Sequence, residues 1–205
     1  MTKKNIRHKF ELSIIIALIV SIFVGIDTCS ANCEDIRENI FRLHVIANSD
    51  SQEDQQLKLA VRDRIISIGG DIFAQVHNKQ EAETIVRPML SEFQRAAEDV
   101  IKEQGYDYSV KVTISNEYFN TRIYEKVTLP AGKYDALRVI IGSGEGKNWW
   151  CVMFPPMCLP AAEETQALNQ VLSEEDLQFV SEYQDYEVRF KVIEWYENIK
   201  NWFHK

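Results

Sequence analysis

The sequence lacks the features that would place it in a specialised class of protein. It has no internal repeat and no low-complexity tract, so solenoids and polar disordered tracts are excluded. Cysteine and histidine are scarce, with four of each, and neither Cys151 nor Cys158 has a histidine or a further cysteine nearby. A zinc site therefore has little support, and we expect neither a metal nor another cofactor. Length and ordinary composition indicate one globular domain.

Basic side chains form no cluster beyond the N-terminus. Residues 1–31 carry four basic and two acidic side chains, which leaves 19 Lys and Arg against 29 Asp and Glu in residues 32–205, a net charge of −10. So acidic a surface is not built to neutralise phosphates, and we expect no nucleic-acid partner. A protein partner is compatible with this charge.

The longest apolar run is short for a membrane helix. It extends from Leu12 to Ile26, about 15 residues or roughly 22 Å as a helix, against a bilayer core of about 30 Å. Basic residues 3–9 precede it and small residues 29–31 follow. This layout predicts a secretory signal peptide cleaved after Ala31, with an uncleaved N-terminal membrane anchor as the alternative. Either way, residues 32–205 are expected to lie outside the cytoplasm.

The first half of the chain predicts one strand and two helices. Alternating residues indicate a strand over Ile36–Ala47. Capping side chains at Asn48–Ser51 start a helix to about Ile68, where Gly69-Gly70 ends or bends it. A second helix spans about Gln80–Gln104, with a kink or break at an internal proline.

The second half predicts strands joined by short connections. Period-two alternation marks residues 106–114, a turn is expected at 116–120, and another strand at 121–129. A hairpin follows, in which the strand ending at Ile141 turns through a glycine-rich segment and pairs with Trp149–Phe154. In this strand Trp149 and Trp150 point to opposite faces.

The last 50 residues give weaker patterns. Residues 159–172 are helical or loosely ordered, a weak helix begins at Ser173, and a short strand followed by a helix is expected within 186–203. The complete order of elements predicts an α+β fold, a single domain with a mostly antiparallel sheet and helices packed on one face.

Candidate catalytic groups each have a structural alternative. His44, Ser49 and Asp50 contain the residue types of a hydrolytic triad, but their closeness in sequence favours a strand histidine followed by a capped helix. The glycine-rich segment ending at Lys147 departs from a phosphate-binding loop, because Asn148 replaces Ser or Thr and a strand follows. Glu145 and Asp50 could form a carboxylate pair only if the fold brings them together.

Cys151 and Cys158 flank a seven-residue turn. Outside the cytoplasm such a pair favours a local disulfide, and a pair of buried thiols is the alternative. A nucleophilic Cys151 partnered by His44 or His77 is a third interpretation.

Three blocks of sequence resemble one family. Residues 41–50 (FRLHVIANSD), 55–63 (QQLKLAVRD) and 144–158 (GEGKNWWCVMFPPMC) resemble stage II sporulation protein R, as does the closing segment VRFKVIEW at 188–195. The N-terminal export segment matches the layout of the family.

The resemblance implies a secreted intercellular signal. Members are made in the forespore, enter the space between forespore and mother cell, and trigger the membrane aspartyl protease that processes pro-sigma-E. The expected partner is therefore that protease, and the expected protein is not an enzyme. We expect the partner-binding residues in the two most distinctive blocks: Arg42, His44, Asn48, Asp50, Trp149 and Trp150.

Two rival hypotheses accompany this one. The first is an exported hydrolase acting on cell wall or peptide through His44, Asp50 or Glu145. The second is a small-ligand-binding module, which would require a deep pocket.

Overall fold

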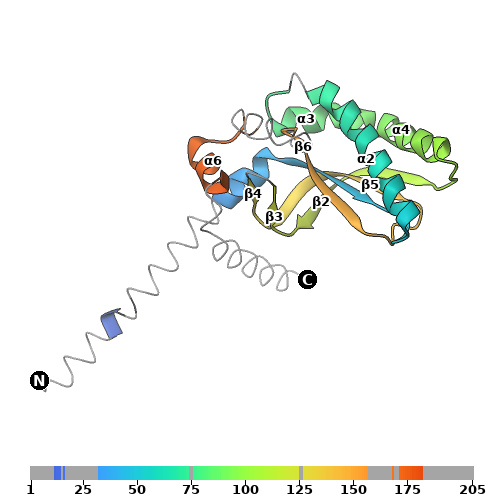
Figure 1. The fold of residues 1–205 in the computed structure, drawn as a ribbon. Coiled ribbons are helices and arrows are strands. Elements are labelled where there is room, and N and C mark those ends of the chain that lie inside the picture. The colour runs from blue at the N-terminus through green and yellow to red at the C-terminus, as the bar shows by residue number, and fades with distance from the viewer. Residues whose placement is uncertain are drawn as a thin grey trace, which may run out of the picture.

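The computed structural model describes residues 12–14, 16, 32–73, 76–124, 127–156, 168 and 171–181 (Figure 1). Its labelled helices are α2 (Gln52–Phe73), α3 (Lys79–Val86), η1 (Arg87–Met89), α4 (Leu90–Glu103) and α6 (Glu174–Ser181). Its strands are β1 (Phe41–Ile46), β2 (Val110–Phe119), β3 (Arg122–Ile123), β4 (Thr128–Leu129), β5 (Gly132–Ile141) and β6 (Asn148–Phe154). Residues 32–39, before β1, are also helical.

The main sheet has the strand order β2-β5-β1-β6. Strand β1 runs parallel to β5 and antiparallel to β6, and β2 is antiparallel to β5. Strands β3 and β4 form a separate antiparallel pair. The predicted α+β class with a mostly antiparallel sheet is confirmed.

The predicted hairpin between residues 136–141 and 149–154 is wrong in its pairing. Both strands exist, but β1 lies between them and pairs with each. All six residues of β1 are buried, as a strand at the centre of a sheet requires. The segment Gly142–Lys147 therefore crosses the C-terminal end of β1 instead of making a tight hairpin turn.

Helices α2, α3 and α4 cover one face of the sheet. Helix α4 shows how sequence directs this packing, because its buried residues, Phe93, Ala97, Val100 and Ile101, recur at helical spacing. They meet Leu43 of β1 and neighbouring apolar strand residues in one hydrophobic cluster. The prediction of helices packed on one face is confirmed for this layer.

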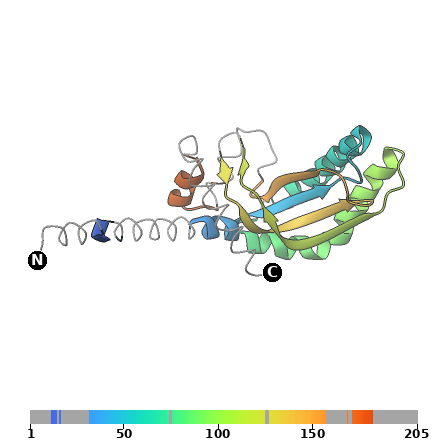
Figure 2. The ribbon, with the colours of Figure 1, turned by 90° about the horizontal axis from the view of Figure 1, so that it is seen from below.

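The opposite face is covered at one end. The pair β3–β4 and helix α6 gather there, near residues 32–39 and away from α4 (Figure 2). A second hydrophobic cluster joins these segments to the sheet and includes Ile36, Phe119, Leu129, Tyr134 and Val180. This arrangement leaves the other end of the same face without a covering element among the described residues.

Several predicted boundaries differ from the structure. Residues 32–39 are helical, so the first strand begins at Phe41 instead of Ile36. Helix α2 continues through Gly69-Gly70. A Cβ at Gly69 would lie 2.8 Å from Met153 Cε, so this glycine serves close helix–sheet packing and does not end the helix. Strand β2 runs through most of the predicted turn at 116–120.

Other predictions lie partly or wholly outside the described residues. The weak helix beginning at Ser173 is confirmed as α6, and Ser173 Oγ accepts a hydrogen bond from Asp176 N at 3.1 Å. Most of 159–172 and all of 186–203 lie outside the described part. So does most of residues 1–31, and their role as signal peptide or anchor stays a prediction. No helix within the described residues combines the length and apolarity needed to cross a membrane.

Candidate functional site

A connected group of polar and aromatic side chains lies on the sheet face opposite α2 and α4. In an antiparallel or parallel ladder, paired residues point to the same face, and here Thr113, Arg138, His44 and Trp150 occupy one row across the four strands. We call the connected group the sheet-face network; its members are His44, Ser115, Glu117, Arg138, Asn148 and Trp150.

His44 is at the centre of the network. It is 4% exposed, its Nδ1 lies 2.6 Å from Glu117 Oε2, and its Nε2 lies 2.8 Å from Asn148 Oδ1. A neutral imidazole donates from one nitrogen and accepts at the other, so the Asn148 amide orientation and the tautomer of His44 are linked. Both ring nitrogens are engaged, which leaves neither directed at an incoming group.

Glu117 connects three strands through its carboxylate. One oxygen contacts His44, and the other accepts a short hydrogen bond from Ser115 Oγ and lies 3.4 Å from Arg138 Nε. Ala136 is the β5 residue paired with both Ser115 and Arg42, and its methyl side chain leaves room for Glu117 to reach His44. The network is thus a product of strand order, because β5 separates β2 from β1.

Trp150 closes the network on the β6 side. Its indole stacks on the His44 ring with centroids 3.7 Å apart and an interplanar angle of 16°. Phe119 meets it edge-on at 4.6 Å, and the Arg122 guanidinium lies 5.9 Å from its centroid. Trp150 is half-buried. Its position is therefore fixed by packing while part of the ring stays accessible.

Arg42 lies deeper on the same face and is fully buried. Its Nη2 donates to Tyr124 Oη at 2.7 Å and its Nε to the Cys151 carbonyl at 3.5 Å, while Nη1 has no hydrogen-bond partner. The guanidinium stacks over Phe119 at 4.2 Å and over Tyr134 at 4.9 Å. No carboxylate in the described part of the chain pairs with Arg42, which is unusual for a buried cation.

Asn48 and Asp50 fasten the glycine-rich segment to the end of β1. Asn48 Oδ1 accepts from Ser143 N at 3.0 Å, and its carbonyl accepts from Glu145 N at 3.2 Å. Asp50 Oδ1 accepts from Lys147 N at 2.7 Å. These contacts give both residues a structural role that holds residues 142–147 across β1.

Two glycines are needed for this fastening. Gly142 has a φ of +56°, and a Cβ there would lie 2.2 Å from Asn48 Oδ1. A Cβ at Gly146 would lie 2.2 Å from the Ser49 carbonyl oxygen. The glycines that resembled a phosphate loop therefore allow close approach to the strand end, and β6 follows instead of a helix.

Asp54, in the first turn of α2, extends the fastening. Its Oδ2 accepts from Asn48 Nδ2 at 2.9 Å and from Ser49 Oγ at 2.6 Å. Burial raises the pKa of Asp54, but the hydrogen bonds from Ser49, Asn48, Tyr108 and Ser51 outweigh it, so its pKa lies below the ordinary value. The capping cluster that the sequence indicated is thus centred on the Asp54 carboxylate, which holds the Asn48 and Ser49 side chains in place.

Trp149 and Cys151 lie on the helix side of β6. Trp149 joins the helix-side cluster, with the Arg62 guanidinium 4.2 Å from its ring centroid. The predicted opposite orientation of the two tryptophans is confirmed. Cys151 is 4% exposed. Cys158 lies outside the described residues, so the disulfide stays a prediction.

The six expected partner-binding residues do not form one surface. Arg42 and His44 are buried, Asn48 and Asp50 hold a loop, and the two tryptophans lie on opposite faces. Their role in partner binding stays a prediction. No sequence pattern singles out Glu117, Arg138 or Asn148 as functional residues. The available signal is the alternation of polar residues along β2, but the sequence predicts a turn at 116–120, which includes Glu117.

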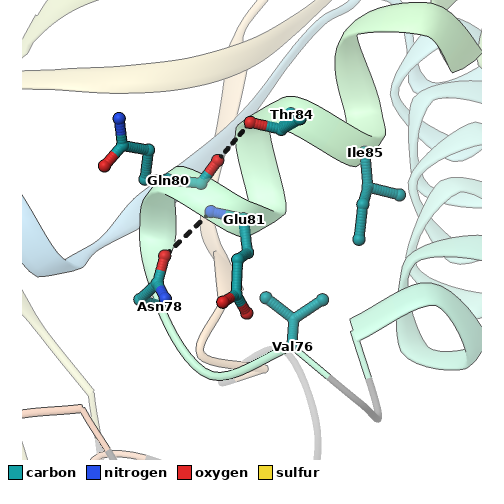
Figure 3. Close-up of a pocket in the computed structure, with 6 residues that line it drawn as sticks. All are labelled: Val76, Asn78, Gln80, Glu81, Thr84 and Ile85. Carbon is teal, nitrogen blue, oxygen red and sulfur yellow. Dashed lines mark hydrogen bonds between the residues drawn. The ribbon is translucent and has the colours of Figure 1, made fainter.

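No metal site is evident in the described part of the chain. No group of three or more His, Cys, Asp or Glu residues there could hold a metal ion. One pocket lies at the N-terminus of α3 (Figure 3). Two of its polar side chains are already used, since Asn78 Oδ1 accepts from Glu81 N at 2.9 Å and Thr84 Oγ1 donates to the Gln80 carbonyl at 2.7 Å.

Comparison with known proteins identifies the family. The family model for stage II sporulation protein R matches residues 37–164, which include the whole sheet-face network. Stage II sporulation protein R of Bacillus subtilis (strain 168) is 33% identical over 135 residues, covering 66% of this chain and 60% of that relative. No solved structure matches the chain. The chain belongs to the stage II sporulation protein R family.

Proposed function

We propose that this protein is an intercellular signal of endospore formation. In this proposal it is made in the forespore, exported into the space between forespore and mother cell, and activates the mother-cell membrane aspartyl protease that processes pro-sigma-E. Membership of the stage II sporulation protein R family is the observation that carries the proposal. The N-terminal segment, as signal peptide or anchor, supplies the export that the proposal needs.

We further propose that the protein acts by binding and not by catalysis. His44 is the residue most suited to acid–base chemistry, yet both of its nitrogens are engaged within the network. In the described structure no hydrogen bond or ion pair joins His44 to Asp50 or to Glu145. The rival hydrolase hypothesis would need these groups to converge on one substrate.

Co-expression in a heterologous bacterium tests the function. The full-length chain, the membrane protease and pro-sigma-E are produced together, and precursor cleavage is followed by immunoblot while the amount of the chain is varied. We expect cleavage to rise with the amount of the chain. Absence of cleavage with a well-folded, exported chain would contradict the proposal.

The same assay separates binding from catalysis. Glu145→Gln removes one carboxylate of the rival hydrolase while keeping a polar side chain. We expect this variant to trigger cleavage when its export and folding match the parent. Loss of cleavage in Glu145→Gln, whose side chain is exposed, would favour the hydrolase.

The Cys151–Cys158 disulfide belongs to this proposal, because an exported chain folds where thiols oxidise. Peptide mass spectrometry of the exported protein without reduction should recover the two cysteines in one linked peptide. Recovery of two alkylated thiols would show that the pair is reduced.

A further inference from the structure

We propose that the uncovered end of the sheet face docks an acidic protein segment, with a carboxylate bound by Arg138 and an apolar side chain packed beside Trp150. The inference deepens the proposed function and rests on it, because the partner it assigns is an exposed segment of the membrane protease. It adds Arg138 and Lys111 to the residues expected to contact that partner.

Several residues at this end of the face are accessible. Lys111 and Asn148 are exposed, Ile140 and Trp150 are half-buried, and 38% of the Arg138 side chain is exposed. By strand register all five point away from α2 and α4. The pair β3–β4 and α6 cover the opposite end (Figure 2). A surface that spans four strands is wide enough for a protein segment, whereas a small ligand requires a concave site.

The charge of this surface is opposite to that of the chain. Lys111 and Arg138 lie on this end, and Arg122 of β3 borders it beside Trp150, which gives three positive charges. Glu117 contributes one negative charge and contacts His44 and Arg138. The adjoining segment 142–147 adds one acidic and one basic side chain, and the exposed Asp50 bonded to it adds one more acidic group, which leaves a balance of +1. A basic surface on a chain of net charge −8 favours an acidic partner and disfavours a second copy of this chain.

The Arg138 guanidinium is held in place by Glu117, but its Nε makes no hydrogen bond within the described residues. Its contact with Glu117 is made through Nε at 3.4 Å, and this buried atom has no hydrogen-bond partner. Strand β5 and Glu117 fix the side chain, while its outer end reaches the exposed part of the face. A guanidinium fork binds a carboxylate through two parallel hydrogen bonds, which lysine cannot reproduce.

Trp150 supplies a rigid apolar contact beside this cation. Stacking on His44 and the edge contact with Phe119 hold the indole before any partner arrives. A preorganised side chain loses little conformational freedom on binding, and Trp and Arg are the residues most enriched among interface hot spots. The His44–Glu117 pair therefore acts as a support, and the partner contacts are Arg138, Trp150 and Lys111.

The experiment uses the full-length chain in the co-expression assay. Arg138→Gln removes the cation while keeping a polar side chain, and Lys111→Glu changes an exposed residue with little effect on folding. We expect Arg138→Gln to require about tenfold more protein for half-maximal cleavage, Arg138→Lys to recover part of the loss, and Lys111→Glu to require about threefold more. Arg95→Glu, an exposed charge reversal on α4, is the matched control and should behave as the parent.

Cross-linking identifies the occupant independently of cleavage. A photoreactive residue is placed at Thr113 on this face and, as control, at Ser91 on α4. We expect Thr113 to cross-link to a segment of the protease rich in Asp and Glu, and Ser91 not to do so. Cross-linking of Thr113 to a second copy of the chain, or to a neutral segment, would overturn the proposal.

Failure of this inference differs from failure of the proposed function. If the parent chain triggers no cleavage, the function itself is contradicted. If the parent triggers cleavage and Arg138→Gln and Lys111→Glu equal Arg95→Glu, the function stands and the docking surface is wrong.

Discussion

The two faces of the sheet differ in what they bury. On the helix side, Leu43, Leu137 and Phe93 are fully buried among other apolar side chains. On the other side, the same strands bury Arg42 and His44, which are 0% and 4% exposed. Successive residues of β1 therefore contribute alternately to an apolar core and to a polar network.

This difference separates stability from specificity. Apolar burial contributes roughly 25 cal/mol per Å², whereas burying a charge without a counter-charge costs several kcal/mol. The helix side has the composition that folding alone favours. The other side carries groups that folding alone would disfavour, which is why we place function there.

The largest expected effect is on the helix side. Phe93→Ala removes a fully buried ring from α4 and should lower the free energy of unfolding by about 3–5 kcal/mol. Urea unfolding followed by tryptophan fluorescence measures it. Ile85→Ala on α3, where the side chain is 38% exposed, is the control and should change stability by less than about 1 kcal/mol. Equal effects of the two variants would contradict the assignment of the core.

Glu117→Gln should have the next largest effect. The substitution keeps a hydrogen-bonding side chain but removes the negative charge of the carboxylate that His44, Ser115 and Arg138 all contact. We expect a loss of about 1–3 kcal/mol in the free energy of unfolding, because hydrogen bonds to charged groups are the stronger ones. Asp99→Asn on the exposed side of α4 is the matched control. A loss no greater than the control would show that the network contributes no stability.

Arg42→Met tests whether the buried charge on the polar side of the sheet lowers the stability of the fold. Met approximates the length of Arg, removes the unpaired buried Nη1 and abolishes the desolvation cost, so we expect stability to rise by about 1 kcal/mol. Signalling in the co-expression assay should fall if Arg42 is retained for function. A stability loss as large as that of Phe93→Ala would mean that Arg42 belongs to the core in the ordinary sense.

Much of the fold was predictable from local patterns. The apolar stripe of α4, the alternation along β1 and the opposite orientation of Trp149 and Trp150 all follow from helical or strand periodicity. These features depend on residues a few positions apart. Local spacing is sufficient to assign such faces.

The strand order and the network were not predictable in the same way. Pairing of β1 with β5 and β6 joins residues distant in sequence, and a glycine-rich segment between two strands usually indicates a hairpin. The contact of His44 with Glu117 exists only because β5 separates their strands and presents Ala136 between them. Nothing in the period of either strand encodes that proximity.

The smallest expected effect concerns the stability of the fold at acidic pH, and it involves Asp54 in the first turn of α2. The lowered pKa of Asp54 means that the unfolded chain binds this proton at a higher pH than the folded chain does. Stability from Asp54 is therefore fully present above its ordinary pKa of about 4 and is lost as the pH falls through the lower folded value. Asp54→Asn should lose stability at neutral pH and should show a shallower further loss between about pH 4 and pH 2.

Urea unfolding at several pH values between about 2 and 7 measures this slope. Ser49→Ala removes one hydrogen bond to the Asp54 carboxylate while leaving its charge, so the pKa of Asp54 in the folded chain should rise. The dependence of stability on pH in this variant should then lie between those of the parent and of Asp54→Asn. If the free energy of unfolding changes with pH in the same way in all three proteins, the charge of Asp54 does not contribute to holding β1 and the glycine-rich segment together.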